Sequence, residues 1–116
     1  MLSLVEASML ALPGNARIFL CQSPMNMRRS FEGLSAEVAR LFPGELLSGA
    51  LFVFFNRSRD HIKVLFWDKD GLVIWYKRLE KGSFGKWGQE ITLDRRGFLM
   101  LLEGVIPKKI TPRFSL

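Results

Sequence analysis

The chain has 116 residues, 48% of them hydrophobic, which fits one globular domain and excludes a largely disordered protein. Its formal net charge is +6, so an acidic partner such as a nucleic acid is favoured over a small neutral substrate. The only cysteine, Cys21, excludes an internal disulfide, and no segment reaches the ~18–20 apolar residues of a membrane span. We therefore expect a cytoplasmic protein without membrane contact.

The first half of the chain predicts an arm, a strand and a helix. Residues 1–14 form the expected N-terminal arm, and residues 17–21 (RIFLC) are typical of a buried strand. A helix is predicted over residues 27–42 with Asn26 as its N-cap. Its apolar stripe follows the spacing of three and four residues, in Met27, Phe31, Leu34, Val38, Leu41 and Phe42.

The middle of the chain predicts three strands, over residues 50–55, 61–67 and 72–79. They are joined by the turn-like segments NRSRD and DKDG, and Asp70-Gly71 is a strong tight-turn signal. These strands form an antiparallel meander.

After the meander, residues 90–93 are expected to extend, and a second helix is predicted over residues 94–103, capped by Thr92. The globular core is expected to cover residues 15–106, followed by a basic C-terminal tail at 107–116. The whole chain is one domain with an α+β fold, in which an antiparallel β-meander of three or more strands carries two helices packed mainly on one face.

Tight turns fix a register for the meander. Trp67 then lies opposite Leu72, and Lys63 lies opposite both Tyr76 and Val53. Neither sheet face is polar in this register. One face is expected to carry the helices, and the other to be covered by a second copy, a partner protein, stacked bases, or the N-terminal strand and arm.

Basic residues gather in residues 56–87, and the strand directions place several of them at one end of the sheet. The expected phosphate-binding residues at this end are Arg57, Arg59, Lys77, Arg78 and Lys81. Lys63, Trp67 and Tyr76 are expected to form an aromatic and basic platform for stacked bases. The competing interpretation is a solvated rim in which Asp60 and Glu80 pair with the cations.

The sequence carries no recognisable catalytic, metal or cofactor site. His61 is the only histidine, and its spacing from Cys21 does not suit zinc. Asp68 and Asp70 are explained as turn formers, and KGSFGKWG lacks the spacing of a phosphate-binding loop. We therefore expect a binding protein without enzymatic activity or cofactor.

The segments LFVFFNRSRDHIKVLFWDKDGLVIWYKRLEKGSF (51–84), PMNMRRSFEGL (24–34) and LLEGV (101–105) resemble a known family. It comprises the TnpB-type accessory proteins, encoded by the second open reading frame of the insertion-sequence-sixty-six class of bacterial transposons. The chain departs from the family pattern at Asn26, Ser58 and Lys69. The resemblance implies a role in transposition beside a separate transposase that carries the catalytic acids.

Together, the residues and the resemblance predict a non-enzymatic accessory protein of DNA transposition. It is expected to bind DNA through the basic sheet end and to help assemble the transposition complex with the transposase and other transposon-encoded proteins. The alternative is a protein–protein adaptor that docks on the transposase, or forms a homo-oligomer, through an apolar sheet face.

Overall fold

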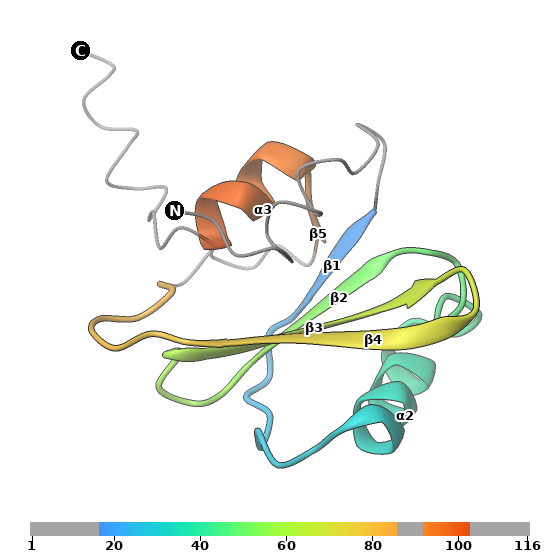
Figure 1. Cartoon of the computed structure of the whole chain (residues 1–116), viewed down its shortest axis with the longest axis horizontal. Helices are drawn as coiled ribbons and strands as arrows, with labels where there is room; N and C mark the ends of the chain where they lie inside the picture. The colour runs from blue at the N-terminus through green and yellow to red at the C-terminus, as the bar shows by residue number, and fades with distance from the viewer. Residues whose placement is uncertain (1–16, 86–91, 103–116) are drawn as a thin grey trace.

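The computed structural model describes residues 17–85 and 92–102, which form one mixed sheet with a helix on each side (Figure 1). The strands are β1 (Ile18–Cys21), β2 (Leu51–Phe55), β3 (His61–Asp68), β4 (Gly71–Arg78) and β5 (Thr92–Leu93). The helices are α2 (Phe31–Leu41) and α3 (Arg95–Leu102). The predicted α+β class is confirmed. The N-terminal arm and the C-terminal tail lie outside the described residues.

The five strands lie in the order β4-β3-β2-β1-β5. The β2–β3–β4 meander is antiparallel as predicted, and β5 pairs antiparallel to β1. The sheet as a whole is mixed, because β1 pairs parallel to β2. The parallel pair follows from the connection: α2 carries the chain from the end of β1 back to the start of β2, as parallel neighbours require.

The register of the second hairpin is confirmed, with Trp67 opposite Leu72 and Lys63 opposite Tyr76. The register predicted for the first hairpin was wrong by one residue, because Val53 lies opposite Val64 and Lys63 lies opposite Phe54.

The loop from β2 to β3 explains this shift. Arg59 adopts a left-handed backbone conformation (φ 58°). The side-chain oxygen of Asn56 accepts hydrogen bonds from the backbone N–H groups of Asp60 and His61, at 3.1 and 3.0 Å. These bonds stabilise a loop one residue longer than the sequence suggested, and a shift of one residue exchanges the two faces of β2 relative to β3.

The two helices cover opposite faces of the sheet, which corrects the prediction that both pack mainly on one face (Figure 1). On one face, Phe98, Leu101 and Leu102 of α3 join a core that includes Phe55 and Trp75. On the other face, α2 contributes its buried residues to a second core, formed by Cys21, Met25, Leu34, Val38, Ala50, Phe52, Phe54 and Leu65. Each apolar face therefore has its own helix.

Both helices begin later than the sequence suggested. Ser30, not Asn26, precedes the first helical residue of α2, while the side-chain oxygen of Asn26 accepts the N–H of Arg28 at 2.8 Å in a local turn. Asp94, not Thr92, caps α3, because its Oδ1 accepts the N–H of Gly97 at 2.7 Å. In the second hairpin the positive φ falls on Lys69 (59°), so the loop is Lys69-Asp70, and Gly71 begins β4.

Candidate nucleic-acid interface

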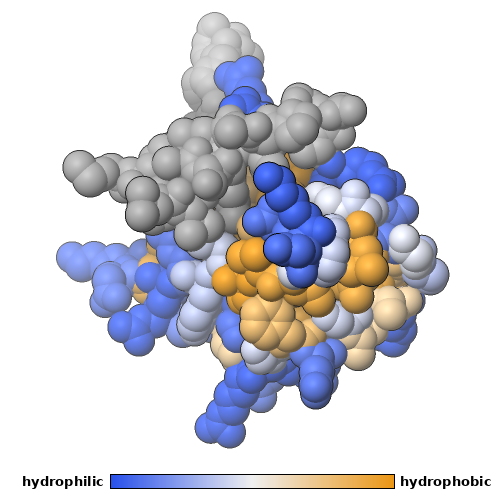
Figure 2. Space-filling model, turned by 45° about the vertical axis from the view of Figure 1, so that its right-hand side comes forward, coloured by the Kyte–Doolittle hydropathy of each residue, from blue (hydrophilic) through white to orange (hydrophobic). Residues whose placement is uncertain are grey.

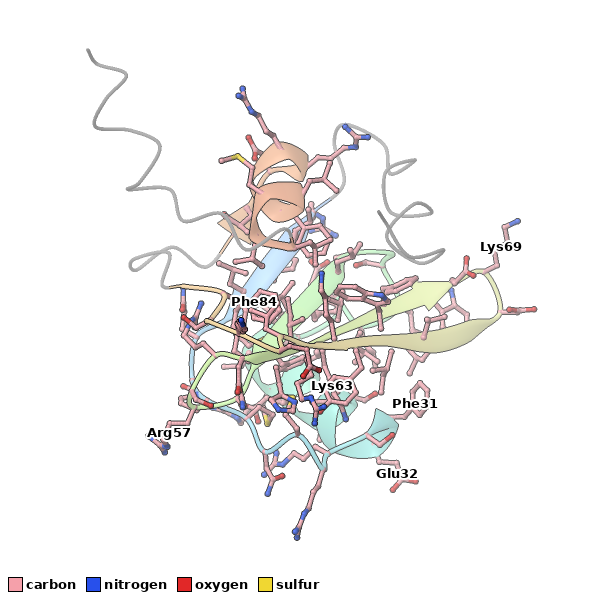
Figure 3. All side chains as sticks on the ribbon, turned by 60° about the vertical axis from the view of Figure 1, so that its left-hand side comes forward. Phe31, Glu32, Arg57, Lys63, Lys69 and Phe84 are labelled. Carbon is pink, nitrogen blue, oxygen red and sulfur yellow. The ribbon has the colours of Figure 1, made fainter. Side chains whose placement is uncertain are left out.

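The predicted separation of charge along the sheet is confirmed. The ladder pairs His61 with Arg78 at one end and Asp68 with Gly71 at the other. The β2–β3 loop and the segment after β4 meet at the first end, where the N–H of Leu79 donates to the carbonyl of Asp60 at 2.7 Å. Arg57 and Lys69 consequently lie at opposite ends of the molecule (Figure 3). We call the end that carries Arg57, Arg78 and Lys81, all exposed, the basic end.

Arg59 lies at this end but is buried, with an exposed fraction of 9%. Its Nε donates to the carbonyl of Gly85 at 2.5 Å, and its guanidinium lies over the Phe55 ring at 3.9 Å from the centroid. The backbone carbonyl of Arg59 also accepts the N–H of Phe84 at 2.7 Å. Burial lowers the pKa of the guanidinium. Arg59 thus fastens the segment after β4 to the β2–β3 loop.

Lys63 is also buried, with an exposed fraction of 9%. Its Nζ donates to the carbonyls of Met27 and Arg29, both at 2.7 Å, so a residue of β3 anchors the loop that precedes α2 (Figure 3). Burial lowers the pKa of this ammonium group. Both hydrogen bonds are charge-assisted, which makes them stronger than bonds between neutral groups.

Lys77 makes a comparable contact on the other face of the sheet. Its Nζ donates to the carbonyl of Leu102, the last residue of α3, at 3.2 Å. A cation at a helix C-terminus interacts favourably with the helix dipole and with the last carbonyls. Lys77 therefore links β4 to α3.

Two of the three predicted platform residues lie together. The Nζ of Lys63 lies 5.0 Å from the ring centroid of Tyr76, and the Tyr76 side chain is 48% exposed. The Tyr76 hydroxyl lies 2.5 Å from Nδ1 of His61, and the two rings stack with centroids 5.6 Å apart. Trp67 lies four residues further along β3, about 13 Å away by the rise of a strand, so it does not join them.

A cleft of about 410 Å³ opens beside this aromatic pair. Its wall is formed by Arg57, Asn56 and His61 and by residues 24–27 from the loop before α2. The N–H of Met25 donates to the carbonyl of Phe55 at 2.8 Å, which ties this loop to the end of β2. The cleft therefore lies between the loop before α2 and the β2–β3 loop, which carries Arg57 of the basic end.

Arg28 and Arg29 follow the cleft-lining residues along the chain, and both are exposed. Sequence reasoning missed them because the helix predicted over residues 27–42 included them, whereas α2 begins at Phe31. The signal was the basic doublet directly before Ser30. The stem of Arg29 packs over α2 at Gly33, where a Cβ would lie 3.2 Å from Arg29 carbons, so glycine there accommodates the arginine.

The acids at the basic end are mostly engaged. Asp60 accepts hydrogen bonds from Asn56 and Ser58 at 2.7 and 2.9 Å, and these bonds lower the pKa of its carboxyl group. Glu80 pairs with Arg78 at 3.4 Å, with both side chains mostly exposed. Among the described residues, no salt bridge involves Arg28, Arg57 or Lys81. The exposed surface at this end is therefore positive.

Neither a metal cluster nor a membrane span is found in the part of the chain that the structure describes. Residues 17–85 and 92–102 contain no group of three or more His, Cys, Asp or Glu side chains that could hold a metal ion. The helices within these ranges are too short and too polar to cross a bilayer.

Comparison with known proteins gives a family match over most of the chain. The family described as IS66 Orf2 like protein matches residues 16–112. The chain is 32% identical over 68 residues to the uncharacterized protein y4jC of Sinorhizobium fredii (strain NBRC 101917 / NGR234), covering 59% of the chain and 58% of that protein. It is 34% identical over 70 residues to the uncharacterized protein y4hO of the same organism, covering 60% and 61%.

The chain thus spans about three fifths of the length of these curated relatives. No solved structure matches it.

Proposed function

Because this chain belongs to the IS66 Orf2-like family of transposition-associated accessory proteins, we propose that it assists transposition by binding DNA phosphates at its basic end. The observation that carries the proposal is that three neighbouring segments carry exposed cations, and that one of these cations, Arg57, lines a cleft between two of the segments. Arg28 and Arg29 come from the loop before α2, Arg57 comes from the β2–β3 loop, and Arg78 and Lys81 come from the end of β4 and beyond.

Seven of the eight residues expected from the sequence take one of three roles in this proposal, and Trp67 takes none. Arg57, Arg78 and Lys81 contact phosphates, because their side chains are exposed. Arg59, Lys63 and Lys77 hold the surface in shape through hydrogen bonds to backbone carbonyls. Tyr76 is the residue proposed to stack on a base, whereas Trp67 lies too far along β3 to belong to the same platform.

Arginine suits this task because its guanidinium offers two parallel hydrogen bonds to a phosphate. Two of the five proposed contacts, Arg28 and Arg29, lie on a loop that is tied to the sheet by Lys63 and by the Met25–Phe55 hydrogen bond. A cation on a tethered loop loses less conformational freedom on binding than one on a free tail. The arrangement therefore supports binding to the DNA backbone with little dependence on sequence.

The test is fluorescence anisotropy with a labelled transposon-end duplex, a scrambled duplex and a single strand, at about 50 mM and about 200 mM salt. The double variant Arg28→Gln/Arg57→Gln removes two proposed phosphate contacts and keeps most of each side chain. We expect its affinity for every duplex to fall about tenfold or more, and the logarithmic salt slope to decrease by about 1.8.

The matched control is Arg40→Gln/Lys69→Asn, which makes the same change in net charge away from the basic end. Lys69 lies at the opposite end of the sheet, and Asn tolerates its positive φ. This control should keep nearly the full salt slope. Equal losses in the two double variants would show that net charge alone governs binding, and no binding at the lower salt would reject the proposal.

The adaptor alternative has less structural support. It required an open apolar sheet face, and each face of the described sheet packs against a helix. A contact with the transposase is proposed on family membership, and it would use a surface other than a sheet face. Co-purification with the transposase would be tested for the original chain and for the Arg28→Gln/Arg57→Gln variant. A direct protein contact would persist in the variant, whereas bridging through DNA would be lost.

A further inference from the structure

The two edges of the sheet are very different. β5 forms one edge with only two residues, and a short edge strand offers little to a partner. β4 forms the other edge with eight residues, and none of them is proline. Among the strands of residues 17–85 and 92–102, only β3 pairs with it. β4 is thus a long edge whose first six residues carry no charge, and its two charged residues, Lys77 and Arg78, lie together at its C-terminal end.

Hairpin geometry decides which backbone groups of β4 point away from β3. The closing pair of the two-residue loop is Asp68 and Gly71. In such a hairpin the closing pair exchanges both hydrogen bonds, and every second pair after it does the same. Residues 71, 73, 75 and 77 therefore bond to β3. The N–H and C=O groups of Leu72, Ile74, Tyr76 and Arg78 point to the free edge.

The side chains of these four residues lie on the α2 face of the sheet. Tyr76 is 48% exposed, Leu72 and Ile74 are half-buried, and Arg78 is exposed. α2 itself packs beside β3 rather than over β4. On the side of the molecule that carries α2 and the β3–β4 turn, Figure 2 shows hydrophobic surface interspersed with hydrophilic residues. The edge thus offers apolar contacts as well as hydrogen bonds.

The charge pattern along β4 fits a second copy of the same strand. β4 begins next to Asp70 and ends at Arg78. Two antiparallel copies related by a two-fold axis keep the same sheet face on the same side, so a residue on the α2 face lies opposite another on that face. With Ile74 opposite Ile74 of the second copy, Leu72 lies opposite Tyr76, and Asp70 lies opposite Arg78.

We propose that two copies of the chain pair antiparallel through β4, in the register centred on Ile74, to form one continuous sheet. In this register the two-fold axis gives two Asp70–Arg78 pairs of opposite charge and two Leu72–Tyr76 pairs. Cross-strand pairs of these types stabilise sheets. Within each copy Arg78 has only the mostly exposed Glu80 as a salt-bridge partner among the described residues, and such pairs are weak. Arg78 is therefore available to a second chain, and in the dimer the proposed phosphate contacts are those of Arg28, Arg29, Arg57 and Lys81.

The test is sedimentation velocity of the full chain over a range of concentrations, without nucleic acid. The expected result is a reversible monomer–dimer equilibrium. Asp70→Arg and Arg78→Glu each replace two attractive pairs by two repulsive ones, and each is expected to raise the dimer dissociation constant at least about tenfold. Circular dichroism and thermal unfolding establish that each variant is folded, as expected for exposed positions.

Mixing the two variants tests the register itself. In the mixed dimer the arginine introduced at position 70 faces the glutamate introduced at position 78, and the unchanged Asp70 faces the unchanged Arg78. A heterodimer should therefore recover an affinity close to that of the original chain, although each variant alone stays monomeric. The control Lys69→Asn lies outside the paired positions and should dimerise normally.

Three results would overturn the proposal. A chain that stays monomeric at all concentrations has no edge pairing. Charge-reversed variants that dimerise as well as the original chain would place the interface elsewhere. A mixture that fails to form the heterodimer would reject the register centred on Ile74.

Discussion

Replacing Lys63 by methionine measures how strongly the sheet holds the loop that carries Arg28 and Arg29. Methionine keeps an unbranched side chain of similar length and removes the ammonium group. The two carbonyls that accept from Nζ at 2.7 Å, those of Met27 and Arg29, then lose their donor. We expect the variant to fold with a lower free energy of unfolding.

The magnitude follows from two opposing effects. Hydrogen bonds to a charged group contribute about 1.5–3 kcal/mol each, so two of them give at most about 6 kcal/mol. Against this, the variant no longer buries an ammonium group, which costs several kcal/mol even when the group is paired. The expected net loss is about 2 kcal/mol.

Urea unfolding followed by tryptophan fluorescence gives the assay, with a lower midpoint at an unchanged slope. The matched control is Lys81→Met, which removes the same charge from an exposed side chain and should change stability by less than about 0.5 kcal/mol. If Lys63→Met is as stable as Lys81→Met, the two hydrogen bonds do not hold the loop. Lys63 would then be free to contact nucleic acid directly.

Three further predictions concern the remaining structure. Burial raises the pKa of the Cys21 thiol from 9.0 to about 12, so the free energy of unfolding keeps its full value below pH 9 and falls by about 4 kcal/mol as the pH rises toward 12. Cys21→Ala should flatten this alkaline loss in urea unfolding measured against pH, and an unchanged profile would contradict the prediction. Lys69→Gly should raise the free energy of unfolding by about 0.5–1 kcal/mol, and with it the thermal midpoint, because glycine adopts the positive φ of this position without strain. A lower midpoint would refute this. Phe98 and Leu34 fill the cores on different faces of the sheet, so Phe98→Ala and Leu34→Ala should each lower the free energy of unfolding in urea by about 2–5 kcal/mol. Leu47 is 59% exposed, so Leu47→Ala should be nearly neutral. A neutral result for either core variant would mean that its sheet face is open.

Sequence reasoning predicted the meander well because its signals are local. Alternating apolar residues and a two-residue turn determine the β3–β4 register, and the structure has that register. The β2–β3 register failed because it depends on the side-chain amide of Asn56 and the left-handed Arg59, which no periodicity shows. One residue of error exchanged the faces of β2 relative to β3.

The candidate site was predicted in outline only. Strand direction placed Arg57, Arg78 and Lys81 at one end, because direction follows from the turns alone. It could not show that Arg59 and Lys63 turn inward to backbone carbonyls, since those carbonyls come from segments 26 to 36 residues away in the sequence. Arg28 and Arg29 were missed for a related reason. Only the observed start of α2 shows that Arg28 and Arg29 lie on a loop and not on a helix face.

The pairing of β1 has a consequence for the order in which the fold assembles. The partners of β1 are distant in the sequence: Ile18 pairs with Leu51 on one side and with Leu93 on the other. Closing such long loops costs more entropy than forming the two adjacent hairpins, and it slows folding. We expect β2, β3 and β4 to form first and β1 to dock later with β5. The candidate DNA-binding loop before α2 would then be completed in a late step, after the sheet that anchors it already exists.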